Sequence, residues 1–117
     1  MEEDRARELI AAERARIEAA LRELIGDVRD EGRLLRQQTG EVEEDGTDLE
    51  TEGVDMALIQ SLRHQRAAVD RAEERIAAGT FGRSIESGTL IPDERLEVAP
   101  LAERTIAEQL AFERGDR

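Results

Sequence analysis

The chain has 117 residues, enough for one domain or for one helical arm with a small module attached. Only two residues are aromatic and 39% are charged, a composition that excludes a deep globular core and favours a helical hairpin or coiled coil. A net charge of −12 argues against DNA or RNA as a direct ligand, because phosphate binding requires a concentrated cationic face, and a protein partner is expected instead.

The first predicted helix extends from Glu2 to about Gln38. It contains no proline and is rich in Ala, Glu, Arg and Leu, which favour helices. Apolar residues recur along it with the spacing of the a and d positions of a heptad repeat, namely Ile10, Ile17, Leu21, Leu24, Val28 and Leu35. Arg14 and Glu31 fall on the same stripe, where they either fix the register or mark places where the stripe is open.

An acidic segment follows at residues 41–55. It holds eight carboxylates and no cation, and Gly46 and Gly53 interrupt it. Eight of the twelve net negative charges of the chain therefore lie here. A block of like charge is most often a solvated loop without a task, so the composition of this segment alone assigns it no function.

The second predicted helix runs from about Val54 to Ala78, with a regular stripe at spacings of four and three. Its members are Leu58, Leu62, Gln65, Val69, Ala72 and Ile76. Two amphipathic helices bury their stripes most simply by folding onto each other. Residues 1–78 are therefore predicted to form an antiparallel coiled-coil hairpin with an acidic tip at 41–55.

Charged residues on the second helix are expected to form a solvated face with ion pairs one turn apart. The spacing predicts Arg66 with Asp70 and Arg71 with Glu74. His64, the one histidine of the chain, has neither a cysteine nor a second histidine to join it, so no metal or catalytic role is expected for it.

A second module is predicted at residues 79–117. Glycine and proline interrupt short apolar pairs between residues 79 and 100, a pattern typical of a compact turn-rich module with one hairpin. From Pro100 the sequence is again helical, with proline at the helix start and Ala102, Ile106 and Leu110 along one side.

This module resembles the C-terminal zinc finger of the DksA/TraR family of bacterial transcription regulators. The residues that match the family pattern are Gly79, Thr80, Phe81, Gly82, Gly88, Ile91, Arg95, Leu96, Pro100 and Ala102. A helical hairpin before the finger is also the family arrangement. The resemblance therefore covers most of the chain, strongly from Ala78 onward and loosely before it.

The four positions that hold zinc in the family are occupied here by Ser84, Ser87, Thr105 and Glu108. Zinc requires thiolate, imidazole or carboxylate donors. We therefore expect a finger-like module that binds no zinc and is insensitive to chelators. No other cofactor is expected. Hydroxyl groups at these positions can close local turns by bonding to the backbone. Apolar packing is expected to replace the metal, through Phe81, Ile85, Leu90, Ile91, Leu96, Val98, Leu101 and Ile106.

The resemblance implies that the hairpin enters the secondary channel of RNA polymerase, where acidic residues at its tip act near the active centre. The usual tip signature, Asp-x-Ala, matches Asp55-Met56-Ala57. If the helices extend further, the tip presents Asp45 and Asp48 instead, and Asp55 lies on the flank of the second helix.

The expected protein is a mainly helical, monomeric, cytoplasmic transcription regulator with RNA polymerase as its partner. No apolar run approaches the ~20 residues that a membrane span requires, no signal-peptide pattern opens the chain, and no nucleophile or phosphate-binding loop suggests an enzyme. The alternative is a structural or adaptor protein, in which loss of zinc accompanied loss of polymerase binding and the coiled coil engages another protein.

Overall fold

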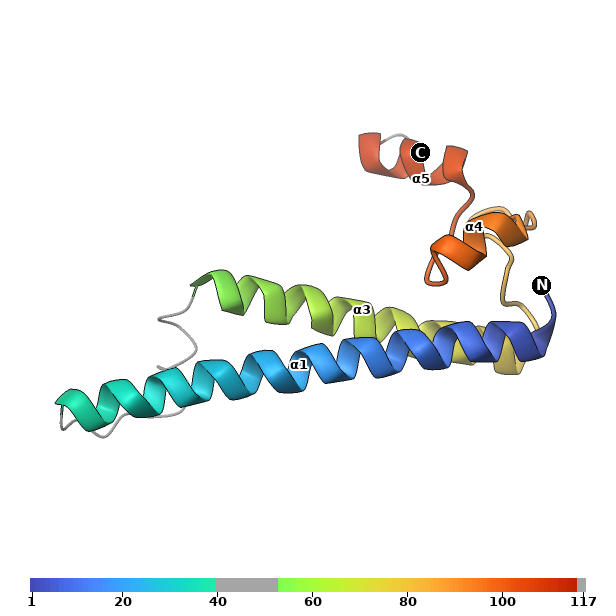
Figure 1. Cartoon of the computed structure of the whole chain (residues 1–117). Helices are drawn as coiled ribbons and strands as arrows, with labels where there is room; N and C mark the ends of the chain where they lie inside the picture. Colours follow the sequence, from blue (N-terminus) through green and yellow to red (C-terminus); the bar gives the residue numbers. More distant parts are fainter. Residues whose placement is uncertain (40–52, 116–117) are drawn as a thin grey trace. The chain divides into compact units, whose positions relative to one another are not determined.

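The computed structural model describes residues 1–39 and 53–115, and in the two long helices it leaves the side chains of residues 27–39 and 53–55 undescribed. Within these residues four helices follow in order: α1 (Glu3–Thr39), α3 (Gly53–Ala78), α4 (Asp93–Val98) and α5 (Ile106–Arg114) (Figure 1). The mainly helical class expected from the sequence is confirmed, and both long helices begin and end within two residues of the predicted bounds. None of these helices is long and apolar enough to span a membrane.

The chain divides into two compact units, and each contains part of α1 and part of α3. One unit combines Met1–Arg14 with Ala68–Arg117, and the other is Ala15–Ala67. Within each unit the α1 segment lies antiparallel to its α3 segment. The division predicted from the sequence, at residue 78, stays a prediction.

Buried apolar side chains from both helices form the core of each unit. In the first unit they are Ala6, Ile10, Val69, Ala72, Ile76, Ile91 and Leu96. In the second they are Ile17, Leu21, Ile59 and Leu62. Seven of these belong to the predicted heptad stripes, whereas the side chains of Val28, Glu31 and Leu35 lie outside the described residues. Burial of such stripes, rather than helix propensity alone, is what stabilises helices of this kind.

One position of the α3 stripe was predicted wrongly. Leu58 is 50% exposed, and Ile59 is buried in its place at 1% exposure. Ile59 and Leu62 are three residues apart, so the stripe begins with a three-residue step instead of the four-residue step from Leu58. Both spacings occur in heptads, and the β-branched neighbour occupies the buried position.

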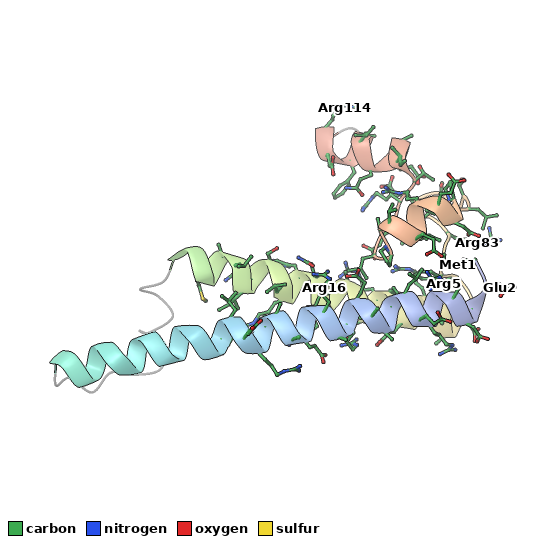
Figure 2. The ribbon with its side chains drawn as sticks, viewed as in Figure 1. Met1, Glu2, Arg5, Arg16, Arg83 and Arg114 are labelled. Atoms are coloured by element: carbon green, nitrogen blue, oxygen red, sulfur yellow. The ribbon has the colours of Figure 1, made fainter. Side chains whose placement is uncertain are left out.

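The predicted ion pairs on α3 differ from those in the structure. Asp70 accepts a hydrogen bond from Nη2 of Arg14 at 2.5 Å, and Glu73 accepts from the same guanidinium, so Arg66 has no Asp70 partner. Arg71 bonds to Glu103 of the C-terminal module instead of Glu74. In the other unit, Arg16 donates a hydrogen bond to the Gln65 side chain at 3.3 Å. Arg16 is labelled in Figure 2. Contacts between elements distant in sequence therefore replaced the local pairs.

The C-terminal module is built on turns and two short helices. An isolated antiparallel bridge joins Arg83 to Leu90, a minimal form of the expected hairpin. The helix predicted from Pro100 begins later, because Thr105 provides the N-cap of α5. Ile91 and Leu96 are buried as expected, but four of the proposed packing residues are exposed, namely Ile85, Leu90, Val98 and Ile106. Apolar packing therefore accounts for only part of this module.

Candidate functional site

The loop after α3 begins with two glycines that the turn requires. Gly79 has φ +76° and ends α3, with the Thr80 amide bonding to the Arg75 carbonyl at 2.8 Å. Gly82 has φ +88° and its carbonyl accepts from the Ile91 amide at 2.7 Å. Glycine tolerates these left-handed conformations without steric cost, so the chain can turn at both positions.

Ser84 lies at the centre of the next turn and is 5% exposed. Its hydroxyl oxygen accepts from the amides of Glu86 and Ser87 at 3.1 and 3.3 Å. The Ser87 hydroxyl accepts in turn from the Thr89 amide at 3.2 Å. These bonds confirm the prediction that hydroxyls at the former ligand positions close local turns.

Thr105 and Glu108 form a capping box at the start of α5. The Thr105 hydroxyl accepts from the Glu108 amide at 3.2 Å, and the Glu108 carboxylate accepts from the Thr105 amide at 2.9 Å. Two backbone N–H groups at the helix terminus are satisfied in this way. The box explains why α5 begins at Ile106, six residues after the helix start predicted at Pro100.

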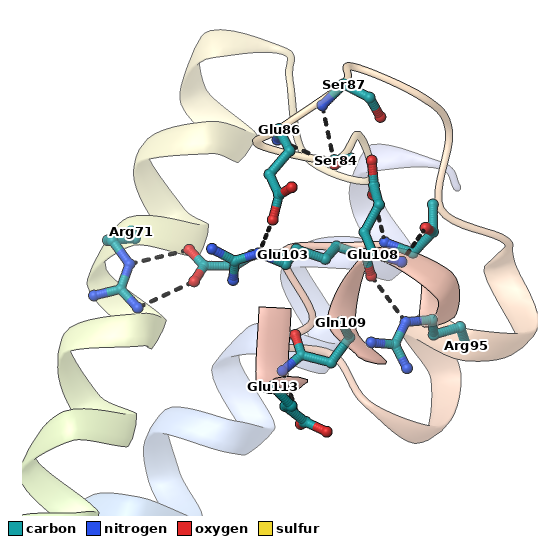
Figure 3. A network of polar contacts seen from close by, with 11 residues as sticks. Arg71, Ser84, Glu86, Ser87, Arg95, Glu103, Glu108, Gln109 and Glu113 are labelled. Atoms are coloured by element: carbon teal, nitrogen blue, oxygen red, sulfur yellow. Dashed lines mark hydrogen bonds and ion pairs between the residues drawn. The ribbon is translucent and has the colours of Figure 1, made fainter. Parts of the chain in front are cut away.

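The other three former ligand positions converge on the Glu108 carboxylate, and Figure 3 shows Ser84 and Ser87 close to it. Hydrogen bonds from the Ser87 hydroxyl, the Thr105 amide and the Ser84 hydroxyl lower the pKa of Glu108 from 4.5 to about 2. The Ser87 hydroxyl also lies within hydrogen-bond distance of the Thr89 hydroxyl, at 3.0 Å. A carboxylate that accepts several hydrogen bonds is strongly favoured in its ionised form.

This donor set does not suit a structural zinc ion. Three of the four groups are neutral hydroxyls, and all four groups already make hydrogen bonds to one another or to backbone amides. Structural zinc is held by thiolates, imidazoles or carboxylates. No other group of three potential metal ligands occurs among the described residues.

Glu103 fastens the module to α3. Its carboxylate accepts from Arg71 at 3.0 and 3.2 Å and from Arg75 at 2.8 Å, and its backbone carbonyl accepts from the Ile85 amide at 2.9 Å. Burial raises the pKa of Glu103, but the hydrogen bonds and charges of Arg71 and Arg75 outweigh it and leave the pKa below its ordinary value. This cluster was not predicted from the sequence, because no local spacing indicates an ion pair between residues about thirty positions apart.

Arg104 joins the Ser84 turn to α5. Its guanidinium pairs with Glu86 and lies 3.8 Å from the centroid of the Phe112 ring. Its backbone carbonyl accepts from Nε of Arg95 at 3.0 Å. Polar contacts therefore connect the turn, α4 and α5, as the close view of Arg95 and Glu86 illustrates (Figure 3).

Comparison with solved structures identifies one with the same arrangement. The structure of the transcription factor DksA2 from Pseudomonas aeruginosa aligns with a TM-score of 0.75 and 24% sequence identity, over 96% of this chain and 83% of that one. No family model matches the sequence, and no curated protein matches it. The chain has a DksA-like fold.

The acidic residues expected at the tip of this DksA-like fold are only partly described. Asp55 lies in the first turn of α3, which begins at Gly53, but its side chain is outside the described residues. Ala57 is exposed, and Asp45 and Asp48 are outside the described residues. A helix start just before Asp55 agrees with the expectation from Gly53, and the choice of tip residue stays a prediction.

Proposed function

We propose that this protein is a transcription regulator that binds RNA polymerase and has no chemistry of its own. The observation that carries the proposal is the DksA-like fold over 96% of the chain, shared with a protein described as a transcription factor. The sequence pattern from Gly79 to Ala102 supports it independently, because it matches the finger of the same family at residues outside the ligand positions.

The proposed mode of binding is insertion of the hairpin of α1 and α3 into the secondary channel. The acidic segment at residues 41–55 would then lie near the active centre. Carboxylates there can influence a bound Mg²⁺ or accept hydrogen bonds from moving polymerase elements. Asp55, in the Asp-x-Ala element, is the first candidate, with Asp45 and Asp48 as the other tip residues.

Co-purification with core RNA polymerase at moderate salt tests the proposal. Retained binding is expected for Asp55→Asn and for the triple variant Asp45→Asn, Asp48→Asn and Asp55→Asn, with the effect on transcription lost. A matched control neutralises three exposed acids elsewhere, Asp4→Asn, Glu74→Gln and Glu94→Gln, and is expected to retain both properties.

Two results would contradict the proposal at different levels. Absence of polymerase from the purified material would favour the adaptor alternative, in which the helices engage another protein. Binding with an unchanged transcriptional effect in the triple Asp variant would leave polymerase binding in place but remove the acidic segment from the mechanism.

A further inference from the structure

Three arginines of the Ala15–Ala67 unit differ from the others whose side chains are described. Elsewhere arginines bond to carboxylates, carbonyls or an amide oxygen, as Arg5, Arg14 and Arg71 do. Arg22, Arg63 and Arg66 make no hydrogen bond or ion pair within the described residues, although the chain carries 29 acids against 17 cations. Guanidinium groups without a partner among the described residues are a feature to be explained in so acidic a protein.

Two of these arginines line one groove. The groove has a volume of about 400 Å³, and its lining consists of Glu18, Leu21, Arg22, Ile25, Gly26 and Arg66. Residues 18, 22 and 25 are spaced as one face of α1, and Arg66 faces them from α3. Gly26 contributes to the opening, since a Cβ atom at that position would meet nothing within 4 Å. The lining therefore combines two aliphatic side chains and two guanidinium groups with one carboxylate.

The third arginine extends the positive charge along α3. Arg63 is one turn before Arg66, about 4.5 Å along the helix axis, and both side chains are exposed. Like charges one turn apart destabilise a helix, so this pair is unfavourable in the free protein unless an anion lies nearby. Glu18, the one carboxylate among the lining residues, already makes an interaction of its own.

We infer that Arg22, Arg63, Arg66 and the groove form a docking surface for an acidic helix of RNA polymerase that carries an aliphatic side chain. Carboxylates three or four residues apart on a helix have the spacing of Arg63 and Arg66. An aliphatic side chain between them would enter the groove and contact Leu21 and Ile25. This inference rests on the proposed function and names the chemistry of the partner surface.

The surface also complements the rest of the chain. With a net charge of −12, the protein is repelled at long range by an acidic partner, so a local cationic patch would fix which face approaches. Such a patch acts mainly on the association rate and on its salt dependence. The salt dependence of binding is therefore a readout that would not change if these arginines served only the stability of the fold.

The test measures the Kd for purified core RNA polymerase as a function of salt concentration. The variant is Arg22→Glu with Arg66→Glu, and the control is Arg7→Glu with Arg83→Glu, which changes the net charge equally at exposed arginines of the other unit. We expect at least roughly tenfold weaker binding and a flatter salt dependence for the first pair, and a change of less than about threefold for the control. Arg22→Lys with Arg66→Lys is expected to retain most of the affinity.

Circular dichroism confirms beforehand that each variant is folded. Equal Kd values and equal salt slopes for the two glutamate pairs would overturn the docking surface while leaving polymerase binding established. If the wild-type protein fails to bind polymerase, the proposed function and the docking surface both fail.

Discussion

At the scale of single residues, Glu108 combines two structural roles. It closes the capping box of α5 with Thr105, and it receives hydrogen bonds from the hydroxyls of Ser84 and Ser87. One carboxylate therefore links the turn at residues 84–87 to the start of a helix about twenty residues later. A negative charge at this point is also favoured by the dipole of α5.

Substitution Glu108→Gln tests this role through its pH dependence. The amide keeps the shape and one acceptor of the carboxylate but loses its charge. The melting temperature at pH 7 is therefore expected to fall by a few degrees. This decrease is smaller than the pKa shift alone implies, because the carboxylate is exposed to solvent. The folded pKa of about 2 lies below the ordinary 4.5, so the stabilisation is complete above pH 4.5 and is lost as the pH falls towards 2.

The difference in melting temperature between wild type and Glu108→Gln should therefore shrink as the pH is lowered from 5 to about 2. Thermal unfolding is measured by far-UV circular dichroism. Glu113→Gln in the same helix is the control, because Glu113 accepts an exposed hydrogen bond from Gln109 and has no other partner among the described residues. A difference that stays constant over this range would mean that the charge of Glu108 is not what stabilises the module.

Local hydrogen bonds could be predicted from the sequence, whereas contacts between helices could not. The hydroxyl turns at Ser84 and Ser87 could be predicted, because such bonds reach only two or three residues along the chain. The clusters of Glu103 with Arg71 and Arg75, and of Arg14 with Asp70, could not. They depend on which helix faces approach each other, whereas spacing within one helix paired Arg71 with Glu74 and Asp70 with Arg66.

At the scale of elements, the paired stripes of α1 and α3 are the most predictable feature. The bounds of both helices and seven buried positions followed from periodicity, since a repeat sustained over many residues determines which face is buried. The error at Leu58 arose where two adjacent apolar residues offered two heptad-compatible steps. Packing against α1, which the sequence of α3 does not contain, selects Ile59.

Alanine substitution distinguishes these two neighbours. Ile59→Ala should lower the free energy of unfolding by about 2–4 kcal/mol, because it removes a fully buried side chain and leaves a cavity. Leu58→Ala, at a half-exposed position, should cost less than about 1 kcal/mol. Urea unfolding followed by circular dichroism measures both, and a larger effect for Leu58 would restore the stripe predicted from the sequence.

At the scale of the whole molecule, hydrogen bonds connect the side chains at the four positions that match zinc ligands in the family pattern. Four side chains at zinc-ligand spacing converge, but three are hydroxyls and several apolar residues expected to compensate are exposed. Ion pairs and caps supply the remaining connections, through Glu103, Arg104 and Thr105. The resulting protein should fold at any zinc concentration.

Chelation tests this expectation with a built-in positive control. EDTA should leave the melting temperature of the wild-type protein unchanged. A variant with Ser84→Cys, Ser87→Cys, Thr105→Cys and Glu108→Cys places four thiols where the present side chains converge, and it should bind zinc and melt at a lower temperature once EDTA is added. Structural zinc supplies roughly 10 kcal/mol or more to small fingers, so the shift should be large.

Zinc retained by the wild-type protein, with a melting temperature that EDTA lowers, would show that the present side chains hold a metal after all. A cysteine variant that takes up no zinc would show that the four positions do not converge in solution.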